Sequence, residues 1–210
     1  MFNYSPNMLK TFCSCPKKFE MKYIHNINAP VSSVPFEKGK KIHALANYYL
    51  RGINIARIET ALTEEEKNIW SLLQNNEYYS KDYFNSEFPL SIRVGDFWIS
   101  GRIDAIVHSG KDYYILDYKT GSTPSDPEYD FQTMVYLLAM DKYLEDYDNL
   151  YFVYINLKTQ KDYVIKFDEN LKSQYSEKLT EICKKIEKTT VFKQDFSQCK
   201  YCEYSKFCKF

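Results

Sequence analysis

Apolar residues recur at roughly helical spacing near the start of the chain, between Pro6 and Ile24, which is typical of a helix with one buried face. These apolar positions are Leu9, Phe12, Phe19 and Tyr23. Pro16 lies among them, and proline lacks a backbone donor and clashes with the preceding helical turn. We therefore expect a broken helix, with a new turn or a kink at Pro16.

Two further helical patterns follow, each preceded by a boundary signal. Residues 31–35 are predicted to be a loop, and from Phe36 apolar residues again fall on one face of a helix. That face contains Ile42, Leu45, Ala46 and Tyr49. Thr63 and Glu66 have the spacing of a capping box, in which each side chain bonds the backbone N–H of the other, so a third helix is expected to begin there.

The pattern then changes to apolar and β-branched runs separated by turn dipeptides. We predict strands at residues 86–94, 97–109 and 112–119, joined by turns at Gly95-Asp96 and Gly110-Lys111. Successive strands joined by such short turns indicate an antiparallel meander. Residues 121–127 contain glycine and two prolines and end it.

The last third of the chain alternates between helix and strand. Residues 128–144 are predicted to be a helix, residues 150–157 and 162–167 two strands, and the chain from Asp168 to about Lys188 a helix. The tail at 198–208 is too short and too polar to fold without a staple. The complete pattern predicts an α/β fold.

Length and composition suit a single domain over residues 1–210, because 210 residues with 44% apolar content can bury a core. No run approaches the length of a membrane span, and the N-terminus lacks the apolar core of a secretory signal. We therefore expect a cytoplasmic protein with no membrane contact. The chain has no net charge, but residues 1–43 carry seven lysines against two acids and residues 184–210 seven against three. Such lysines either solvate terminal helices or contact a polyanion, and charge alone does not decide between the two.

Asp117 and Lys119 lie two residues apart at the end of a predicted strand, so their side chains leave the same face. Antiparallel pairing with the preceding strand would bring the carboxylate of Asp104 beside that of Asp117. Two adjacent carboxylates suit a hard cation such as Mg²⁺ or Mn²⁺, and a lysine beside them can orient water or stabilise charge on phosphorus. This combination favours phosphodiester hydrolysis. Considered alone, Asp117 and Lys119 are better explained as an ordinary surface ion pair at the end of a strand, and the neighbouring residues change this interpretation.

The segments GRIDAI, ILDYKTG and QTMVYLLAM together resemble the RecB-like branch of the PD-(D/E)XK nuclease superfamily. The resemblance implies catalytic roles for Asp104, Asp117 and Lys119. It also matches Gln132 and Tyr136 to the QxxxY helix of that family. Ile103 stands where the family name has proline, as is common in the RecB-like branch.

The same resemblance adds a histidine to the metal ligands. GKKIH, from Gly39 to His43, matches a glycine-to-histidine pattern on an upstream helix of the family, which makes His43 a ligand together with Asp104 and Asp117. Glu87 precedes them on a predicted strand. A water-mediated accessory role and an outward-facing edge charge both explain Glu87.

Six cysteines in a cytoplasmic protein argue against disulfides, and four thiolates suit either zinc or an iron-sulfur cluster. Cys199, Cys202 and Cys208 are closely spaced near the C-terminus. The layout is similar to that of the AddB nuclease domain and of CRISPR-associated RecB-like exonucleases, which implies a [4Fe-4S] cluster, with zinc as the less favoured occupant. Their cysteine-proline pattern implies Cys15 as the fourth ligand, in a clasp formed by residues 1–24 and 189–210.

These observations lead to one expected fold and activity. The fold is a restriction-endonuclease-like core, a mixed central β-sheet flanked by helices, with the termini joined by a metal cluster. The resemblance implies a Mg²⁺- or Mn²⁺-dependent deoxyribonuclease, an exonuclease on single-stranded or end-containing DNA, working with a helicase or a CRISPR integration complex. The alternative is a DNA-end-binding adaptor subunit of a larger complex, with a silent or partner-licensed nuclease site, and the same chemistry also permits RNA as substrate.

Overall fold

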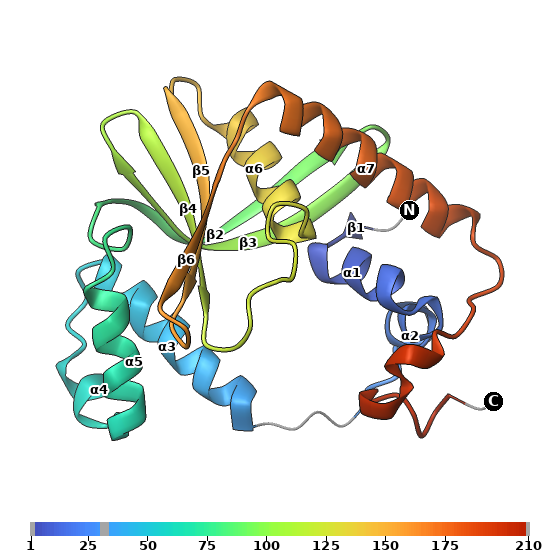
Figure 1. Ribbon diagram of the computed structural model, residues 1–210, viewed down its shortest axis with the longest axis horizontal. Helices are drawn as coiled ribbons and strands as arrows, with labels where there is room; N and C mark the ends of the chain where they lie inside the picture. The colour runs from blue at the N-terminus through green and yellow to red at the C-terminus, as the bar shows by residue number, and fades with distance from the viewer. Residues whose placement is uncertain (1–2, 30–33, 209–210) are drawn as a thin grey trace.

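A mixed β-sheet forms the centre of the protein in the computed structural model, which describes residues 3–29 and 34–208 (Figure 1). Within these residues the sheet has six strands in the order β1-β3-β4-β5-β6, with β2 paired to β3. The strands are β1 (Asn3–Tyr4), β2 (Asp82–Val94), β3 (Phe97–Ser109), β4 (Asp112–Lys119), β5 (Asn149–Asn156) and β6 (Lys161–Lys166). The expected mixed α/β fold is confirmed.

The predicted meander is confirmed, because β2 pairs antiparallel with β3, and β3 with β4. Gly95 and Gly110 occupy the two turns with φ of 58° and 60°, a region that glycine enters without steric cost. Strand β5 then lies parallel to β4 after a helical crossover, and β6 pairs antiparallel with β5. β4 therefore lies inside the sheet, and the acidic and basic pair at its end is held between neighbouring strands.

Helices cover both faces of the sheet. One face carries α1 (Pro6–Ser14), α6 (Phe131–Tyr143) and α7 (Glu169–Lys188), whose apolar side chains join one core cluster. The other face carries α3 (Val34–Leu50), α4 (Ala56–Thr60) and α5 (Glu64–Gln74), with a second cluster. The sheet is therefore buried on both sides. None of the helices in the described part of the chain combines the length and apolar character needed to span a bilayer.

Several predicted boundaries are confirmed by capping contacts. The Thr63 and Glu66 capping box opens α5, and Asp168 caps α7 by accepting from Leu171 N at 2.8 Å. Pro16 is the first residue of α2 (Pro16–Phe19), after a break at Cys15. The π-helix η1 (Glu20–Ile24) continues α2.

Other boundaries differ from the sequence prediction. Helix α3 begins at Val34 rather than Phe36, and β2 begins at Asp82, four residues before the predicted start. Helix α6 is shorter than expected because Asp130 caps it through the backbone N–H of Gln132. The sequence pattern did not predict β1 or α4. The predicted loop at 31–33 lies outside the described residues.

The segment around α2 lies beside the C-terminal segment of the described chain (Figure 1). The backbone N–H of Lys17 donates to Lys193 O at 3.1 Å, and Lys18 Nζ lies 3.0 Å from a carboxylate oxygen of Glu203. The hydroxyl of Tyr204 donates to Ile27 O at 3.1 Å. The segment around α2 therefore contacts the 3₁₀-helix η2 (Phe196–Tyr201) and the residues after it.

Candidate active site

The candidate site lies where β3 and β4 separate. The two strands pair from the Gly110 turn as far as Ala105 and Leu116. Beyond Leu116, β4 is no longer paired with β3 but remains paired with β5. Asp104 is the first residue of β3 past this point. Its Oδ2 accepts a hydrogen bond from Tyr118 N at 3.3 Å, which ties the carboxylate to the end of β4. The fork therefore holds two acidic residues, Asp104 and Asp117, on adjacent strand ends.

Asp117, Lys119 and Gln132 form a closed triangle between β4 and α6. Lys119 Nζ lies 2.7 Å from Asp117 Oδ2 and donates to Gln132 Oε1 at 3.2 Å. Gln132 Nε2 donates to Asp117 Oδ1 at 3.1 Å. The amide thus orients both charged groups at once. The ion pair that the sequence suggested is present, but it is buried rather than exposed, because Asp117 is 4% exposed.

Asp117 is held in an environment that disfavours its charge. Burial raises its pKa to about 6, the ammonium of Lys119 opposes this rise, and the charge of Asp104 adds to it. Its Oδ2 contacts the ammonium of Lys119, and its Oδ1 accepts from the amide of Gln132. Among the described residues, Asp117 lies outside the group of possible metal ligands whose atoms are within 4.8 Å of one another, so the predicted set of His43, Asp104 and Asp117 is brought together only in part.

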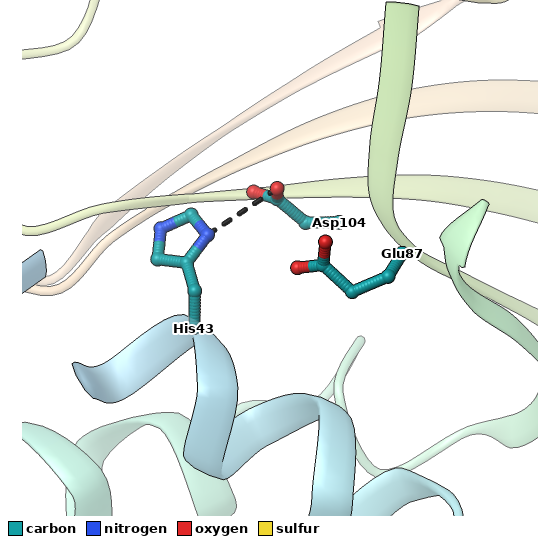
Figure 2. A group of neighbouring side chains, drawn as sticks. All are labelled: His43, Glu87 and Asp104. Atoms are coloured by element: carbon teal, nitrogen blue, oxygen red, sulfur yellow. Dashed lines mark ion pairs between the residues drawn. The ribbon is translucent and has the colours of Figure 1, made fainter. Parts of the chain in front are cut away.

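His43 on α3 faces Asp104 across the fork (Figure 2). Its Nδ1 lies 3.3 Å from Asp104 Oδ1, and its Nε2 lies 3.1 Å from Tyr118 O. Burial alone would lower the pKa of His43, but the hydrogen bond and charge of Asp104 raise it above the ordinary value. Both ring nitrogens face oxygen acceptors, so the position favours positive charge. Either a proton or a bound cation is able to supply that charge.

Glu87 joins this group from β2. One ligand atom each from His43, Glu87 and Asp104 lies within 4.8 Å of the others (Figure 2). Glu87 is directly across from Asp104, because the flanking pairs are Ser86 with Ala105 and Phe88 with Ile103. Its φ of 49° is unusual for a side chain of this type and marks a local distortion of the strand.

The register of the β2–β3 hairpin is the sequence signal that could have placed Glu87 at the site. A turn at Gly95-Asp96 pairs Val94 with Phe97, and counting back along both strands sets Glu87 opposite Asp104. Sequence reasoning left an edge charge as an equal explanation. In the structure Glu87 instead lines the cavity and lies 2.8 Å from Arg102 Nε.

Tyr136 lies one turn beyond Gln132 on α6, but its hydroxyl contacts the backbone of β3. It accepts from Arg102 N at 3.4 Å, and its ring stacks on Phe152 at 6.3 Å between centroids. Gly101 makes this approach possible, because a Cβ there would lie 2.5 Å from Tyr136 Cε1. Tyr136 thus sets the distance between α6 and the strand that carries Asp104.

The chain matches one family profile over almost its full length. The family is the PD-(D/E)XK nuclease superfamily, and the match covers residues 3–209. The chain belongs to the PD-(D/E)XK nuclease superfamily. The sequence-based resemblance and the restriction-endonuclease-like fold class are therefore confirmed.

Two curated relatives share part of this PD-(D/E)XK chain. The RecBCD enzyme subunit RecB of Borreliella burgdorferi is 26% identical over 166 residues, which cover 70% of this chain and 13% of that subunit. The CRISPR-associated exonuclease Cas4 of Francisella tularensis subsp. novicida is 26% identical over 125 residues, 58% of this chain and 61% of the relative. The chain spans less than two thirds of the length of either relative.

A solved structure shares the PD-(D/E)XK fold. The crystal structure of a candidate exonuclease from Eubacterium rectale matches with a TM-score of 0.62 at 12% identity, over 99% of this chain and 89% of that one. At this identity the likeness concerns the fold alone.

The PD-(D/E)XK site opens into a cavity of about 750 Å³, within the range of ligand pockets. Helix α3 forms one wall and the β2–β3 hairpin the other, and the metal-type group of His43, Glu87 and Asp104 lies between them. The cavity also contains two cationic side chains, Lys40 and Arg102. A phosphate group entering it would meet positive charge from both walls.

The four predicted cysteine ligands come together where the chain ends meet. They line a separate cavity of about 100 Å³, and they are Cys15, Cys199, Cys202 and Cys208. The sulfur of Cys15 accepts from the N–H groups of Lys18 at 3.4 Å and Asp195 at 3.5 Å. Burial, then the charges of the other three cysteines, raises the pKa of Cys208. Cys13 is exposed and Cys183 is buried elsewhere, so neither belongs to this group.

Proposed function

We propose that this chain is a divalent-metal-dependent deoxyribonuclease that hydrolyses phosphodiester bonds. The observation that carries the proposal is the convergence of Asp104, Asp117 and Lys119 at the β3–β4 fork, with His43 facing them. A membership in the nuclease superfamily supports the same chemistry. The open cavity beside these residues provides space for a nucleic-acid strand.

The residues that would hold the cation are His43, Asp104 and Asp117, with Glu87 as an additional carboxylate. Their mixture of one imidazole and several carboxylate oxygens suits Mg²⁺ or Mn²⁺. A divalent ion held there supplies Lewis acidity and neutralises charge on the phosphate. The buried Oδ2 of Asp117 and the acceptors around His43 are the features that fit such an ion.

Lys119 is proposed to act on the reacting phosphate and water. Its ammonium reaches the site from the same strand face as Asp117, so it is able to orient the attacking water and stabilise negative charge on phosphorus. Gln132 positions both Lys119 and Asp117 through its amide. Tyr136 acts further back, by fixing α6 against β3.

The substrate is proposed to be DNA with a single strand or a free end. One relative is named a CRISPR-associated exonuclease and another a subunit of the RecBCD enzyme, which supports an exonuclease within a larger assembly. The partner would then be a helicase or a CRISPR integration complex. Lysine-rich ends that meet in the structure offer a basic surface for the backbone of such DNA.

A cleavage assay on the purified protein tests this function. Labelled single strands blocked at the 5′ or the 3′ end are incubated with Mn²⁺, Mg²⁺ or EDTA. We expect metal-dependent shortening of at least one substrate, and Asp117→Asn should abolish it. Binding of DNA ends without cleavage under any of these conditions would instead support an adaptor, and shortening of RNA alone would change the substrate class.

The four cysteines are proposed to hold a [4Fe-4S] cluster. Four thiolates also suit a tetrahedral zinc site, and their spacing alone does not separate zinc from a cluster. The cluster is favoured because the cysteine layout is similar to that of the AddB nuclease domain and of CRISPR-associated RecB-like exonucleases. N–H groups directed at Cys15, as found here, also stabilise cluster ligands. The cluster would join residues 1–24 and 189–210 into a clasp within a single domain.

A further inference from the structure

The outer edge of α3 has the arrangement of a single-strand binding rail. Residues four apart lie on one helix face, about 6 Å apart along the axis. The row that contains Gly39 and His43 faces the candidate metal site, to which His43 itself belongs. The adjacent row contains Lys40, Ala44 and Tyr48, and all three line the 750 Å³ cavity at its rim.

From this arrangement we propose that Tyr48 stacks on an unpaired base of the substrate, making α3 the element that selects single-stranded DNA. The inference rests on the proposed nuclease function and deepens it by naming a specificity-determining residue. Base stacking on aromatic rings is the usual way in which proteins hold single strands without reading sequence. A paired duplex hides its base faces, so such a ring favours a single strand or a frayed end.

The ring of Tyr48 is available for this contact. It is 38% exposed, and no aromatic ring of the described residues packs against it. Tyr49 is also exposed, at 45%, but its ring packs edge-on against Trp70 at 5.3 Å and stacks on Tyr79 at 6.0 Å, although the sequence pattern placed it on the buried face of the helix. Tyr48 also lies outside both core clusters. Its ring therefore has no evident role in folding.

Cationic side chains near Tyr48 are placed to contact the phosphate backbone of a bound strand. Lys40 is exposed two turns before it on the same row, and Ala44 between them leaves space along the helix. On the opposite wall Arg102 is 68% exposed at its side chain and paired with Glu87. A strand passing through the cavity would thus have a cation on each side and an aromatic platform about 12 Å along α3 from Lys40.

The contact is tested by direct binding without turnover. A short fluorescein-labelled oligothymidylate is titrated by anisotropy in metal-free buffer. Tyr48→Ala should weaken binding by about five-fold or more, the range measured for loss of one stacked base. Tyr48→Phe keeps the ring and should bind like the unmodified protein. Tyr163→Ala removes a tyrosine of similar exposure, 41%, on β6 and should change little.

Four further readouts separate a binding role from general damage. Tyr48→Ala should keep its melting temperature and its Mn²⁺ affinity, and in cleavage it should raise KM while kcat is unchanged. Binding of a blunt duplex without free single strands should not respond to Tyr48→Ala. Equal binding of oligothymidylate by Tyr48→Ala and unmodified protein, or an equal loss with Tyr163→Ala, would overturn the proposal.

Failure of this inference can be distinguished from failure of the proposed nuclease function. Binding of oligothymidylate through Tyr48 without any cleavage would support the binding role of Tyr48 and contradict the proposed nuclease function. Cleavage of DNA that does not depend on Tyr48 would support the nuclease function and contradict the binding role of Tyr48.

Discussion

Lys119 is the residue whose removal should separate cleavage from folding. Lys119→Ala deletes the ammonium that is proposed to act on the attacking water and the phosphate, and we expect cleavage to fall by about 10²- to 10⁴-fold, the usual contribution of a positioned proton-transfer group. The fold should persist, because Asp117 is able to take up a proton instead of remaining a buried unpaired charge. Initial rates and a thermal melt measure the two effects.

A surface lysine provides the matched control for Lys119. Lys111 Nζ lies 2.6 Å from Asp146 in an exposed pair far along β4 from the fork, and Lys111→Ala should leave cleavage unchanged. Cleavage by Lys119→Ala at the rate of the unmodified protein would remove Lys119 from the mechanism. A collapse of the melting temperature would instead assign it to the fold.

The protonation of Asp117 and His43 predicts how metal affinity depends on pH. Both groups hold a proton to higher pH than usual: burial raises the pKa of Asp117 to about 6, and Asp104 raises that of His43. A cation must displace these protons, so Mn²⁺ affinity should increase as pH rises through about 6 and above the ordinary histidine range. Titrations followed by electron paramagnetic resonance at pH 5.5, 6.5 and 7.5, chosen as about one unit either side of 6.5, would show it. An affinity independent of pH over this range would contradict the proposed ligands.

At the scale of elements, the packing of α6 against β3 depends on one glycine. Gly101→Ala would set a Cβ 2.5 Å from Cε1 of the buried Tyr136, so the helix or the strand must shift. Overpacking of this kind typically costs about 1–3 kcal/mol of unfolding free energy. Urea denaturation should show that loss, and cleavage should fall as well because Gln132 moves with the helix.

Gly121→Ala is the control for this element. No atom lies within 4 Å of a Cβ at that position, and its backbone is not in the left-handed region. Its stability should change by less than about 0.5 kcal/mol. Equal stability of Gly101→Ala and Gly121→Ala would show that Tyr136 does not set the spacing between α6 and β3.

Local sequence patterns predicted the individual helices and strands better than they predicted which strands pair in the sheet. The turn glycines and alternating residues fixed the β2–β3–β4 meander, and with it the approach of Asp104 to Asp117. The parallel position of β5 beside β4 has no local signal, because a crossover pairing depends on contacts distant in sequence; only the family resemblance implied a mixed sheet. The two-residue strand β1 is likewise too short to leave a periodic pattern.

The candidate site shows the same division. His43 was expected from the family pattern and lies 3.3 Å from Asp104, although a lone histidine on a helix carries little information by itself. The position of Glu87 opposite Asp104 could have been predicted from the register of the hairpin. Its left-handed backbone conformation could not. Tyr48 carries no sequence signal, since only the cavity distinguishes it from the packed Tyr49.

At the scale of the whole molecule, direct contacts hold the segment around α2 against the C-terminal segment. The bonds from Lys17 to Lys193 and from Lys18 to Glu203 already hold α2 against the C-terminal segment. The proposed cluster would add a covalent constraint between Cys15 and Cys199, 184 positions apart. By the relation used for disulfides, closing a loop of that length stabilises the folded state by about 4–5 kcal/mol at most.

Loss of one cysteine ligand should therefore remove both the cluster and this stabilisation. Cys208→Ser is expected to lower iron and sulfide content, bleach the brown colour of anaerobically purified protein, and reduce the free energy of unfolding by up to about 4 kcal/mol. Cys13→Ser, which replaces an exposed thiol outside the cavity, should retain colour and stability. Metal analysis and urea denaturation measure the two properties together. Stoichiometric zinc in a colourless protein would reverse the choice of metal, and unchanged stability in Cys208→Ser would show that the direct contacts alone hold the ends together.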